Sequence, residues 1–552
     1  MSTATPSPQE IQETSAPPAQ AAGRPAQSWL VILLVFVSGG VSLGVEMAAS
    51  RLLAPYFGTS LFVWANLIGL ILLYLTVGYY VGGRLADRFP RPTVLYGITA
   101  LASLLVALIP PLSRPILHWS LSAFATYSVG VFYGSLVSVI LLFLLPMVLL
   151  GCVSPFAIRL SVDQVGKSGR IAGLLYAIST AGSILGTFLP VLVLIPNYGT
   201  AMTFIIMAAA LLLVSIIGLL FSVKPQQKSP AEKARFLSIL LLLPLGGAFL
   251  ASQGNIKPAS GIDDNGNIGG KLLEEHESGY NYIQVVQVGE ETQLILNEGL
   301  GVHSIYNPKR VTTEGGGPWD YFLIAPFFNN SFSPDQVKKV CIIGLGGGTS
   351  ARGFSEAYKS VAIDGVEIDQ KIVDMGEKYF HLGETNTNVI VQDGRYFLES
   401  TTNKYDVIGI DAYQQPYIPF QLTSTEFFST VRSHLTPNGV AVINVGRTND
   451  DFRLVNAMAQ NMKTVFSNVY IVDTLRFTNS LIIGTNAKTN LGNFQKNTML
   501  VDNPLLKEIA YQALVTGKLR EEKQAHVYFT DDLAPIEQMI DQIIFNVAQH
   551  SL

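Results

Sequence analysis

The sequence has little charge and almost no cysteine, and both shortages narrow the classes of protein it can encode. Only 14% of its 552 residues are Asp, Glu, Lys or Arg, the formal net charge is -4, and 49% of residues are hydrophobic. Proteins that bind nucleic acid need a basic surface to neutralise phosphates, so nucleic acid is not expected as a partner. The apolar composition is unlike that of an ordinary soluble enzyme, and it predicts that part of the chain lies in a membrane.

The two cysteines, Cys152 and Cys341, are far apart, and each lies in an apolar run. This spacing predicts neither a disulfide framework nor a cysteine metal site. We expect both to be buried small hydrophobic residues, and we expect no bound metal.

Residues 1–27 are rich in Pro, Ala, Ser, Thr and Gln, which predicts a disordered tail. Residues 28–252 contain apolar runs long enough to cross a bilayer, which takes about 20 residues each. We therefore expect a multi-pass α-helical domain in the cell membrane, in contact with lipid. Its runs number about seven, at 29–52, 61–83, 93–112, 130–152, 171–195, 201–222 and 236–252.

Basic residues concentrate in alternate loops of this region. They are Arg84, Arg88 and Arg91 after the second run, Arg159, Lys167 and Arg170 after the fourth, and Lys224, Lys228, Lys233 and Arg235 after the sixth. The positive-inside rule places these loops and the N-terminus in the cytoplasm. Seven full crossings would then put everything after residue 252 on the other side.

Two further features mark the apolar region. Glu46 and Arg51 lie near the end of the first run, where ionisable side chains are costly and often functional, although an interfacial ion pair is the simpler interpretation. Small residues at four-residue spacing predict close helix packing. They are Gly173, Ala177 and Ala181, and Gly182 with Gly186.

After residue 252 the pattern changes to that of a soluble protein. Residues 253–271 form a linker rich in Gly, Asn and Asp. Residues 272–335 predict a small β-region, in which "YNYIQVVQVGEETQLILNEG" is typical of a β-hairpin.

From residue 336 to 552, short apolar runs alternate with segments that fit helices, for example 423–435 and 452–465. Strands separated by helices predict a mostly parallel, doubly wound Rossmann-like sheet. The last two strands are joined too closely for a helical crossover, so we expect the sheet to end in an antiparallel pair.

The stretch "IIGLGGGTSARGF" places a glycine-rich turn between the first strand of this sheet and a helix. Such a turn lets the backbone approach a nucleotide, with a helix N-terminus behind it. The absence of a Gly-Lys-Ser/Thr ending excludes a P-loop. The spacing of Gly344, Gly346 and Gly348 fits the loop of AdoMet-dependent enzymes, while Gly346, Gly348 and Ala351 also fit a dinucleotide fingerprint.

Polar residues at the ends of the following strands favour an AdoMet-type nucleoside. Glu367 ends the second strand, where a carboxylate accepts hydrogen bonds from ribose hydroxyls. Asp393 and Gly394 follow the third strand, where they could meet the adenine. Asp411 closes the fourth strand, at the edge where ligands of such sheets bind.

Several motifs together resemble the spermidine synthase, or polyamine aminopropyltransferase, family. They are "HESGYNYIQV", "IIGLGGG", "GVEID", "QDGRYFL", "YDVIGIDAY" and "PFQLTSTEFFSTVRSHLTPNGVAVINV". "LNEGLGVHSIYNP", "PWDYFLIAP" and "FTDDLAPIE" are similar to a membrane-fused form of that family. The resemblance covers about residues 272–540.

The resemblance implies transfer of an aminopropyl group from decarboxylated AdoMet to an amine or polyamine, with release of methylthioadenosine. Asp411 would be the base, Glu367 would hold the ribose, and Asp393 with Gly394 the adenine. Tyr280 matches a family position near the substrate. Such enzymes form dimers or tetramers, so a homo-oligomer is also implied.

Two positions depart from the family pattern. Gly347 stands where the family turn has an aspartate facing the donor amine, and Gln414 stands where a second acid follows Asp411 at three-residue spacing. An ammonium–carboxylate contact is worth roughly 4 kcal/mol at 4 Å and an effective dielectric of about 20, before desolvation. Acids that could substitute in binding the substrate are Glu298, Asp320, Asp531, Asp532 and Glu537.

Three functions therefore remain open. The first is a membrane-bound aminopropyltransferase. The second is an AdoMet-dependent methyltransferase or other transferase that acts on a non-diamine acceptor. The third is a transporter or sensor whose nucleoside domain only binds. Because these donors are made in the cytoplasm, the first function also requires the run at 236–252 to be re-entrant or interfacial.

Overall fold

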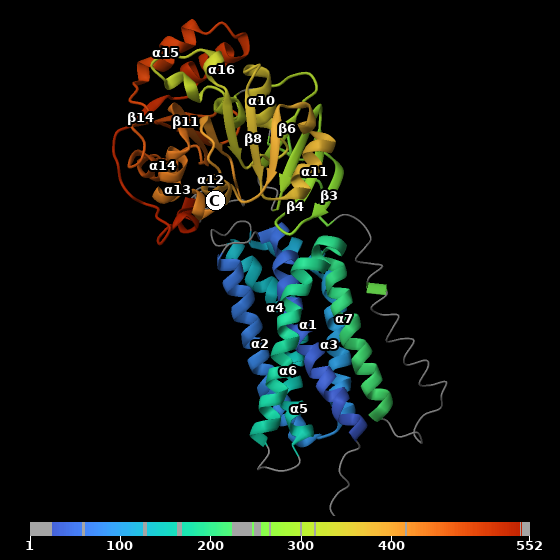
Figure 1. The fold of residues 1–552 in the computed structure, drawn as a ribbon. Helices are drawn as coiled ribbons and strands as arrows, with labels where there is room; N and C mark the ends of the chain where they lie inside the picture. Colours follow the sequence, from blue (N-terminus) through green and yellow to red (C-terminus); the bar gives the residue numbers. More distant parts are fainter. Residues whose placement is uncertain are drawn as a thin grey trace, which may run out of the picture.

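The computed structural model describes most of the chain and shows a helical bundle with an α/β domain at one end (Figure 1). The described residues are 25–57, 61–124, 130–162, 168–222, 246–247, 256–263, 266–297, 301–313, 316–413, 417–540 and 542–543. The predicted tail therefore lies outside the described residues as far as residue 24, and a helix already begins at Pro25. The predicted run at 236–252 also lies outside them, apart from residues 246–247.

Six of the predicted apolar runs are helical. The bundle contains α1 (Pro25–Phe57), α2 (Leu61–Arg88), α3 (Pro92–Phe124), α4 (Gly130–Gly151), α5 (Val153–Ser161), α6 (Ser168–Leu189), a π-helical turn η2 (Pro190–Leu194) and α7 (Ile195–Ser222). By length and composition, five helical stretches of the described chain can cross a membrane. The last of these, Ser168–Ser222, is bent at Gly199, where φ is 79°, and α6 and α7 form two separate rods (Figure 1).

Close contacts between α1 and α6 confirm the predicted small-residue packing at Gly182 and Gly186, but not at Gly173, where a Cβ would have no atom within 4 Å. A Cβ at Gly182 would lie 1.9 Å from the carbonyl oxygen of Phe36, and one at Gly186 would lie 2.0 Å from that of Gly40. Only glycine fits at these two crossings, because any side chain would overlap the backbone of α1. The outer surface of the bundle carries exposed apolar side chains such as Leu145 and Leu192.

The α/β domain lies at the end of the bundle where α1 ends and α7 begins. The hydroxyl of Tyr56 donates to the carbonyl oxygen of Ile256 at 3.2 Å, and the Thr200 hydroxyl donates to Glu277 at 2.8 Å. The C-terminal part of α7 packs at the opposite end, where Gly218 contacts Tyr96 near the start of α3. That opposite end also carries the basic loop that follows α2.

The small β-region is a four-stranded antiparallel sheet with the strand order β3-β4-β5-β6. Its strands are β3 (Lys271–Glu277), β4 (Tyr282–Val288), β5 (Glu291–Leu296) and β6 (Val302–Tyr306), preceded by a short pair, β1 (Gly261–Ile262) and β2 (Ile268–Gly269). Strands β4 and β5 confirm the predicted hairpin. Ile283 and Leu294 of this sheet pack against Ile372 and Met375 of α11, which joins the sheet to the larger domain.

The larger domain is built on an eight-stranded, mostly parallel sheet with the order β14-β12-β13-β11-β10-β7-β8-β9. The strands are β7 (Lys339–Ile343), β8 (Ala362–Glu367), β9 (Thr387–Val391), β10 (Tyr405–Ile410), β11 (Leu435–Gly446), β12 (Asn468–Asp473), β13 (Asn479–Thr485) and β14 (Arg520–Glu522). Strand β13 is antiparallel to both β11 and β12, which confirms the predicted antiparallel end. The predicted fold class, apolar helices followed by a Rossmann-like domain, is confirmed.

Helices cover both faces of this sheet. They are α9 (Pro318–Phe322), α10 (Thr349–Ala357), α11 (Gln370–Tyr379), α12 (Gly394–Ser400), α13 (Thr425–Ser433), α14 (Arg453–Lys463), α15 (Leu491–Leu500) and α16 (Pro504–Thr516), with short 3-10 turns η4 (Ala325–Phe328), η5 (Pro334–Gln336), η6 (Leu382–Glu384) and η7 (Phe420–Leu422). Side chains alternate along β7: Val340 and Ile342 enter one core, while Cys341 and Ile343 enter the other. Both cysteines of the chain are buried and free.

The α1–α6 contact yields a stability prediction. We expect Gly186→Val to destabilise the bundle by about 1–3 kcal/mol or more, because the added side chain would overlap the backbone of α1. Gly173→Val in the same helix is the control, since no atom lies within 4 Å of the position that its Cβ would take. Thermal unfolding in detergent measures both. Equal melting temperatures for the two variants would contradict the packing.

Candidate functional site

The glycine-rich turn after β7 brings two strand ends into close contact. Gly344, Gly346 and Gly348 have φ values of 82°, 57° and 95°, a region that side chains rarely adopt. A Cβ at Gly344 would lie 2.5 Å from the carbonyl oxygen of Asp411, which follows β10. The turn therefore passes directly beside the end of β10, and α10 begins immediately behind it.

Glu367, the last residue of β8, is held against this turn. Its carboxylate accepts hydrogen bonds from the backbone amides of Gly346 at 2.9 Å and Asp369 at 3.2 Å. The side chain is buried, and this burial raises the pKa of Glu367 to about 7 although the two amides favour the charged form. Glu367 thus lies beside the turn, where the sequence predicts a ribose-binding carboxylate.

Asp411 presents its carboxylate to the same cavity from the end of β10. The side-chain amide of Asn444 donates to its Oδ1 at 2.9 Å, and the Trp319 indole also donates to it. Desolvation outweighs these two donors and raises the pKa of Asp411 to about 7. A carboxyl group with such a pKa can exchange a proton near neutral pH.

Neighbouring strands orient Asp411 through a short hydrogen-bonded series. The Asn479 side chain on β13 donates to Asn444 on β11 at 2.9 Å, which fixes the amide that in turn donates to Asp411. The Tyr413 hydroxyl donates to the backbone oxygen of Asn444 at 3.0 Å and accepts from the Gly446 amide at 2.8 Å. Asn444 is therefore held at both its backbone and its side chain.

Asp393 and Gly394 lie at the start of α12 and line the same cavity. Asp393 caps this helix by accepting from the amide of Tyr396 at 2.9 Å. Gly394 packs so tightly that a Cβ would lie 2.2 Å from Ile343 Cγ2. Because residue 394 has no side chain, the first residue of α12 packs directly against Ile343, the last residue of β7.

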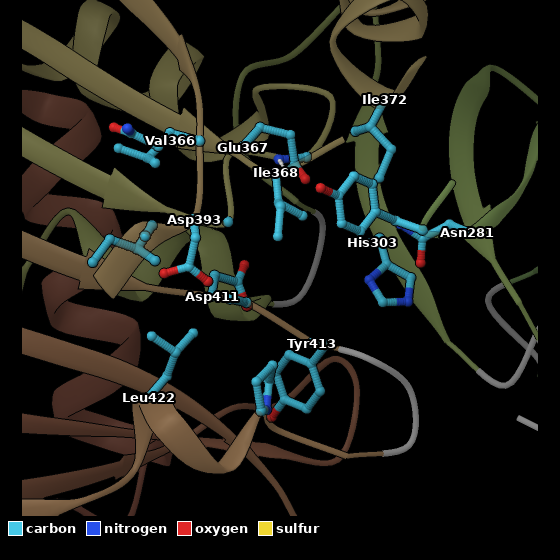
Figure 2. Close-up of a pocket in the computed structure, with 18 of the residues that line it drawn as sticks. Asn281, His303, Val366, Glu367, Ile368, Ile372, Asp393, Asp411, Tyr413 and Leu422 are labelled. Atoms are coloured by element: carbon cyan, nitrogen blue, oxygen red, sulfur yellow. Dashed lines mark hydrogen bonds between the residues drawn. The ribbon is translucent and has the colours of Figure 1, made fainter. Parts of the chain in front are cut away.

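One cavity of about 170 Å³ unites most of the predicted site residues. Its described lining is Tyr280, Asn281, Leu296, His303, Ile343, Gly344, Gly346, Val366, Glu367, Ile368, Ile372, Gln392, Asp393, Gly394, Asp411, Ala412, Tyr413, Pro419, Gln421 and Leu422. Figure 2 shows Asp393 and Asp411 close together, with Glu367 above them and His303 and Asn281 on the side of the small β-region. The described lining contains three carboxylates and neither Lys nor Arg, so it suits a cation.

The remaining predicted residues lie elsewhere. Gln414 lies outside the described residues, as does Glu298. Asp320 is not part of the cavity lining, because its buried carboxylate accepts from the backbone amides of Thr313 and Gly317 at the start of α9. Its assignment as a substrate residue has no geometric support. Asp531 forms a bidentate ion pair with Arg395, in which each guanidinium nitrogen lies 2.6 Å from one carboxylate oxygen.

Gly347 and Gly348 face away from the cavity, unlike Gly344 and Gly346, and neither is part of its described lining. A Cβ at Gly348 would lie 2.6 Å from Leu382. A Cβ at Gly347 would lie 2.9 Å from the ring of Phe380, which is buried. The Gly347 amide donates to Ser304 Oγ at 2.7 Å. An aspartate at this position would require Phe380 to move, so the glycine is built into the local packing.

Sequence reasoning missed four residues of the site: His303, Tyr413, Trp319 and Asn444. Tyr413 lies two positions after Asp411, and this proximity was a usable signal. His303 comes from the small β-region, Trp319 from α9 and Asn444 from β11, all far from Asp411 in the sequence. Only the folded chain brings His303 to the cavity lining and brings Trp319 and Asn444 to the Asp411 carboxylate.

The fold and the cavity define a class: a Rossmann-like α/β domain with an acidic cavity at the carboxyl ends of its parallel strands, attached to a bundle of apolar helices. The family model described as the spermine/spermidine synthase domain matches residues 328–497 of the C-terminal region.

Curated relatives of the chain have matching names. A probable polyamine aminopropyl transferase from Bifidobacterium longum is 35% identical over 301 residues, which cover 50% of this chain and 65% of the relative. A polyamine aminopropyltransferase from Vibrio vulnificus is 30% identical over 168 residues, or 29% of this chain and 55% of the relative. The chain thus spans less than two thirds of either protein.

A third relative extends the similarity toward the bundle. The polyamine aminopropyltransferase of Oceanobacillus iheyensis is 24% identical over 384 residues, or 68% of this chain and 69% of the relative. Because fewer than 300 residues follow Ile256, this match must include part of the helical region.

Solved structures that are similar to the chain include a probable spermidine synthase from Corynebacterium glutamicum. It has a TM-score of 0.37 and 18% identity, over 48% of this chain and 99% of that one. Spermidine synthase in complex with the transition state analogue AdoDATO has a TM-score of 0.36 and 18% identity, over 48% of this chain and 94% of that one.

The raised pKa of Asp411 predicts how stability depends on pH. An ordinary aspartate in the unfolded chain has a pKa of about 3.9, so between about pH 4 and 7 the folded protein binds the extra proton and loses stability as the pH rises. Asp411→Asn removes this loss. We therefore expect its melting temperature, relative to wild type, to rise from about pH 4 to 7 and then level off. A variant less stable than wild type at pH 8 would show that the carboxylate itself stabilises the fold.

Proposed function

We propose that the protein is a membrane-bound polyamine aminopropyltransferase that uses decarboxylated AdoMet as donor. The observation that carries this proposal is the partly buried carboxylate of Asp411, which has a pKa near 7 and shares one cavity with Glu367, Asp393 and the glycine turn. The spermine/spermidine synthase domain at residues 328–497 supports the same reaction.

Each carboxylate would have one task in this reaction. Glu367 would accept hydrogen bonds from the ribose hydroxyls, as carboxylates at this strand end do in related folds. Asp393 and Gly394 would meet the adenine. The donor sulfonium and a polyamine are both cations, and the described lining contains three carboxylates and no Lys or Arg to oppose them.

The chemical step is a single displacement. The lone pair of a neutral amine attacks the aminopropyl carbon next to the sulfonium, a new N–C bond forms, and the C–S bond breaks with its electrons passing to sulfur. Methylthioadenosine leaves as a neutral thioether, and Asp411 takes the proton that the amine loses. Because the sulfonium is already a good leaving group, positioning of the two reactants supplies much of the barrier reduction.

A methyltransferase is the second candidate, and Gly347 favours it. With glycine at this position the turn has no carboxylate to repel the carboxyl group of AdoMet itself, and the Phe380 ring fills the space that a side chain would need. Calorimetry with AdoMet and with decarboxylated AdoMet distinguishes the two candidates, because only AdoMet carries the carboxylate. A methyltransferase should bind AdoMet more tightly, and an aminopropyltransferase should bind the decarboxylated form more tightly. A domain that binds either donor without turnover would support the binding-only alternative.

The membrane location rests on the bundle. Its described helices include five stretches that are long and apolar enough to cross a bilayer, and large apolar side chains such as Leu72 and Leu192 are exposed on its surface. In water such an apolar surface would cause aggregation, whereas contact with lipid tails carries no desolvation penalty for these side chains. Assembly into a homo-oligomer stays a prediction from the resemblance.

The proposed reaction predicts a specific loss in Asp411→Asn. Full-length protein should form methylthioadenosine from decarboxylated AdoMet and a polyamine, and the variant should do so about 10²–10⁴-fold more slowly, the usual contribution of a general base. The wild-type rate should rise as the pH passes through about 7, because Asp411 becomes an unprotonated base there; this rise should be absent from the variant.

Asp364→Asn is the matched control for this assay. Asp364 is also buried in β8, but it is not part of the cavity lining and instead accepts hydrogen bonds from Asn388 and Tyr405, so its variant should keep the wild-type rate. Methyl transfer from AdoMet by the same preparation, without any methylthioadenosine from the decarboxylated donor, would replace the proposed function by the second candidate.

The position of the basic loops predicts the side of the α/β domain. Arg84, Arg88 and Arg91 lie at or just after the end of α2, at the end of the bundle opposite the domain, so the positive-inside rule places the domain on the non-cytoplasmic face. A phosphatase reporter fused after Leu552 should be active, and a fluorescent protein fused there should be dark. Because the donor is made in the cytoplasm, that outcome would weigh against the aminopropyltransferase proposal, whereas the reverse result would place the domain on the side where the donor is made.

A further inference from the structure

The bundle contacts the rim of the candidate site through Arg51, near the end of α1. The guanidinium Nη1 donates to the backbone oxygen of Tyr280 at 2.9 Å, and it lies within electrostatic reach of Glu277 and Asp369. Tyr280 is half exposed and lines the cavity. An arginine of the apolar bundle is therefore bonded to a loop of the candidate site.

A second contact fixes the start of the same loop. Glu277 ends β3 and accepts from both the backbone amide and the hydroxyl of Thr200, at 2.8 Å each. Thr200 follows Gly199, whose left-handed φ of 79° bends α7 near its start. The backbone bend of the bundle thus exposes the amide that binds Glu277.

Hydrogen bonds continue from this loop to the ribose-side carboxylate. Ser278 Oγ donates to Asp369 at 2.5 Å, and the Asn281 side chain donates to the same oxygen at 3.0 Å. The amide of Asp369 donates to Glu367 Oε1 at 3.2 Å. The loop from Ser278 to Asn281 is therefore bonded to the bundle on one side and to the Asp369–Glu367 corner on the other.

A groove lined by both parts of the molecule runs beside this loop. Pro196 of α7 lines it together with residues of the α/β domain, and it shares Tyr280, Ile368, Gln392 and Asp393 with the nucleoside cavity. The cavity thus continues to the end of the bundle. A shift of α1 or of the Gly199 bend would therefore move residues that line both the groove and the cavity.

We propose that Arg51 is a positioning residue for the nucleoside site, acting through the loop of residues 278–281. Through this contact the helical bundle is part of the binding machinery rather than only an anchor. The proposal rests on the proposed function for its turnover measurement, but nucleoside binding tests it independently. The positions of α1 and α7 then determine the position of the loop of residues 278–281, and through it the affinity of the site for the nucleoside.

The test uses full-length protein in detergent, with Arg51→Ala, Arg51→Lys and the control Arg159→Ala. Arg159 is also a bundle arginine in a hydrogen-bonded pair, with Asp87, but it lies at the far end. Calorimetry gives the dissociation constant for methylthioadenosine, the proposed product. Steady-state kinetics give kcat and KM for the donor, and hydrogen exchange reports the amides of residues 278–281.

We expect Arg51→Ala to weaken methylthioadenosine binding and to raise the donor KM by about tenfold, the usual effect of losing one hydrogen bond to a charged group. Its loop amides should exchange faster, and kcat should change less than KM. Arg51→Lys keeps the charge and a donor, so it should recover most of the affinity. Arg159→Ala should match wild type in every measurement.

Two results would overturn this inference. One is an Arg51→Ala protein with wild-type affinity, KM and loop exchange; the other is an equal loss of affinity in Arg159→Ala. If Arg51→Ala does not fold, Thr200→Ala removes a single bond at the same junction and is held to the same criteria. If wild type binds methylthioadenosine without turnover, the proposed function fails, but the comparison of affinities still decides the role of Arg51.

Discussion

The close approach of Gly344 to the backbone of Asp411 is the constraint on which the candidate site depends. A Cβ at residue 344 would lie 2.5 Å from the Asp411 carbonyl oxygen, and the residue has a φ of 82°. Glycine meets both conditions without strain. Because the turn passes so near the end of β10, the Gly346 amide reaches Glu367, and the carboxylates of two different strands face one cavity.

The charge of the cavity follows from this geometry. Desolvation raises the pKa of Glu367 and of Asp411, while hydrogen bonds from backbone amides, Asn444 and Trp319 limit the rise. A cationic ligand would lower both pKa values again, because it would stabilise the ionised carboxylates of Glu367 and Asp411. The bundle contributes to the same wall, because Arg51 and Thr200 hold the loop that contains Tyr280. The helical bundle and the candidate site are thus joined by a few hydrogen bonds.

Local patterns were enough to predict much of the fold. The hairpin of β4 and β5, the alternation of strands and helices, and the helices α13 and α14 all follow from periodicity within short windows. The antiparallel position of β13 followed from a connection too short for a crossover. Strand β14 was missed because Arg520–Glu522 has no apolar alternation; its place depends on pairing with β12, far away in the sequence.

Strand ends and glycine turns are set by local chemistry, so the amino-acid sequence alone predicts which residues stand at or just after the ends of β7, β8, β9 and β10. It therefore named Gly344, Glu367, Asp393 and Asp411 as one group, and the cavity lining contains all four. The folded arrangement was needed to show that Asp320 caps a helix, that Gly347 faces Phe380, and that Arg51 reaches Tyr280. Those outcomes depend on contacts between segments far apart in the chain, and no local pattern records such contacts.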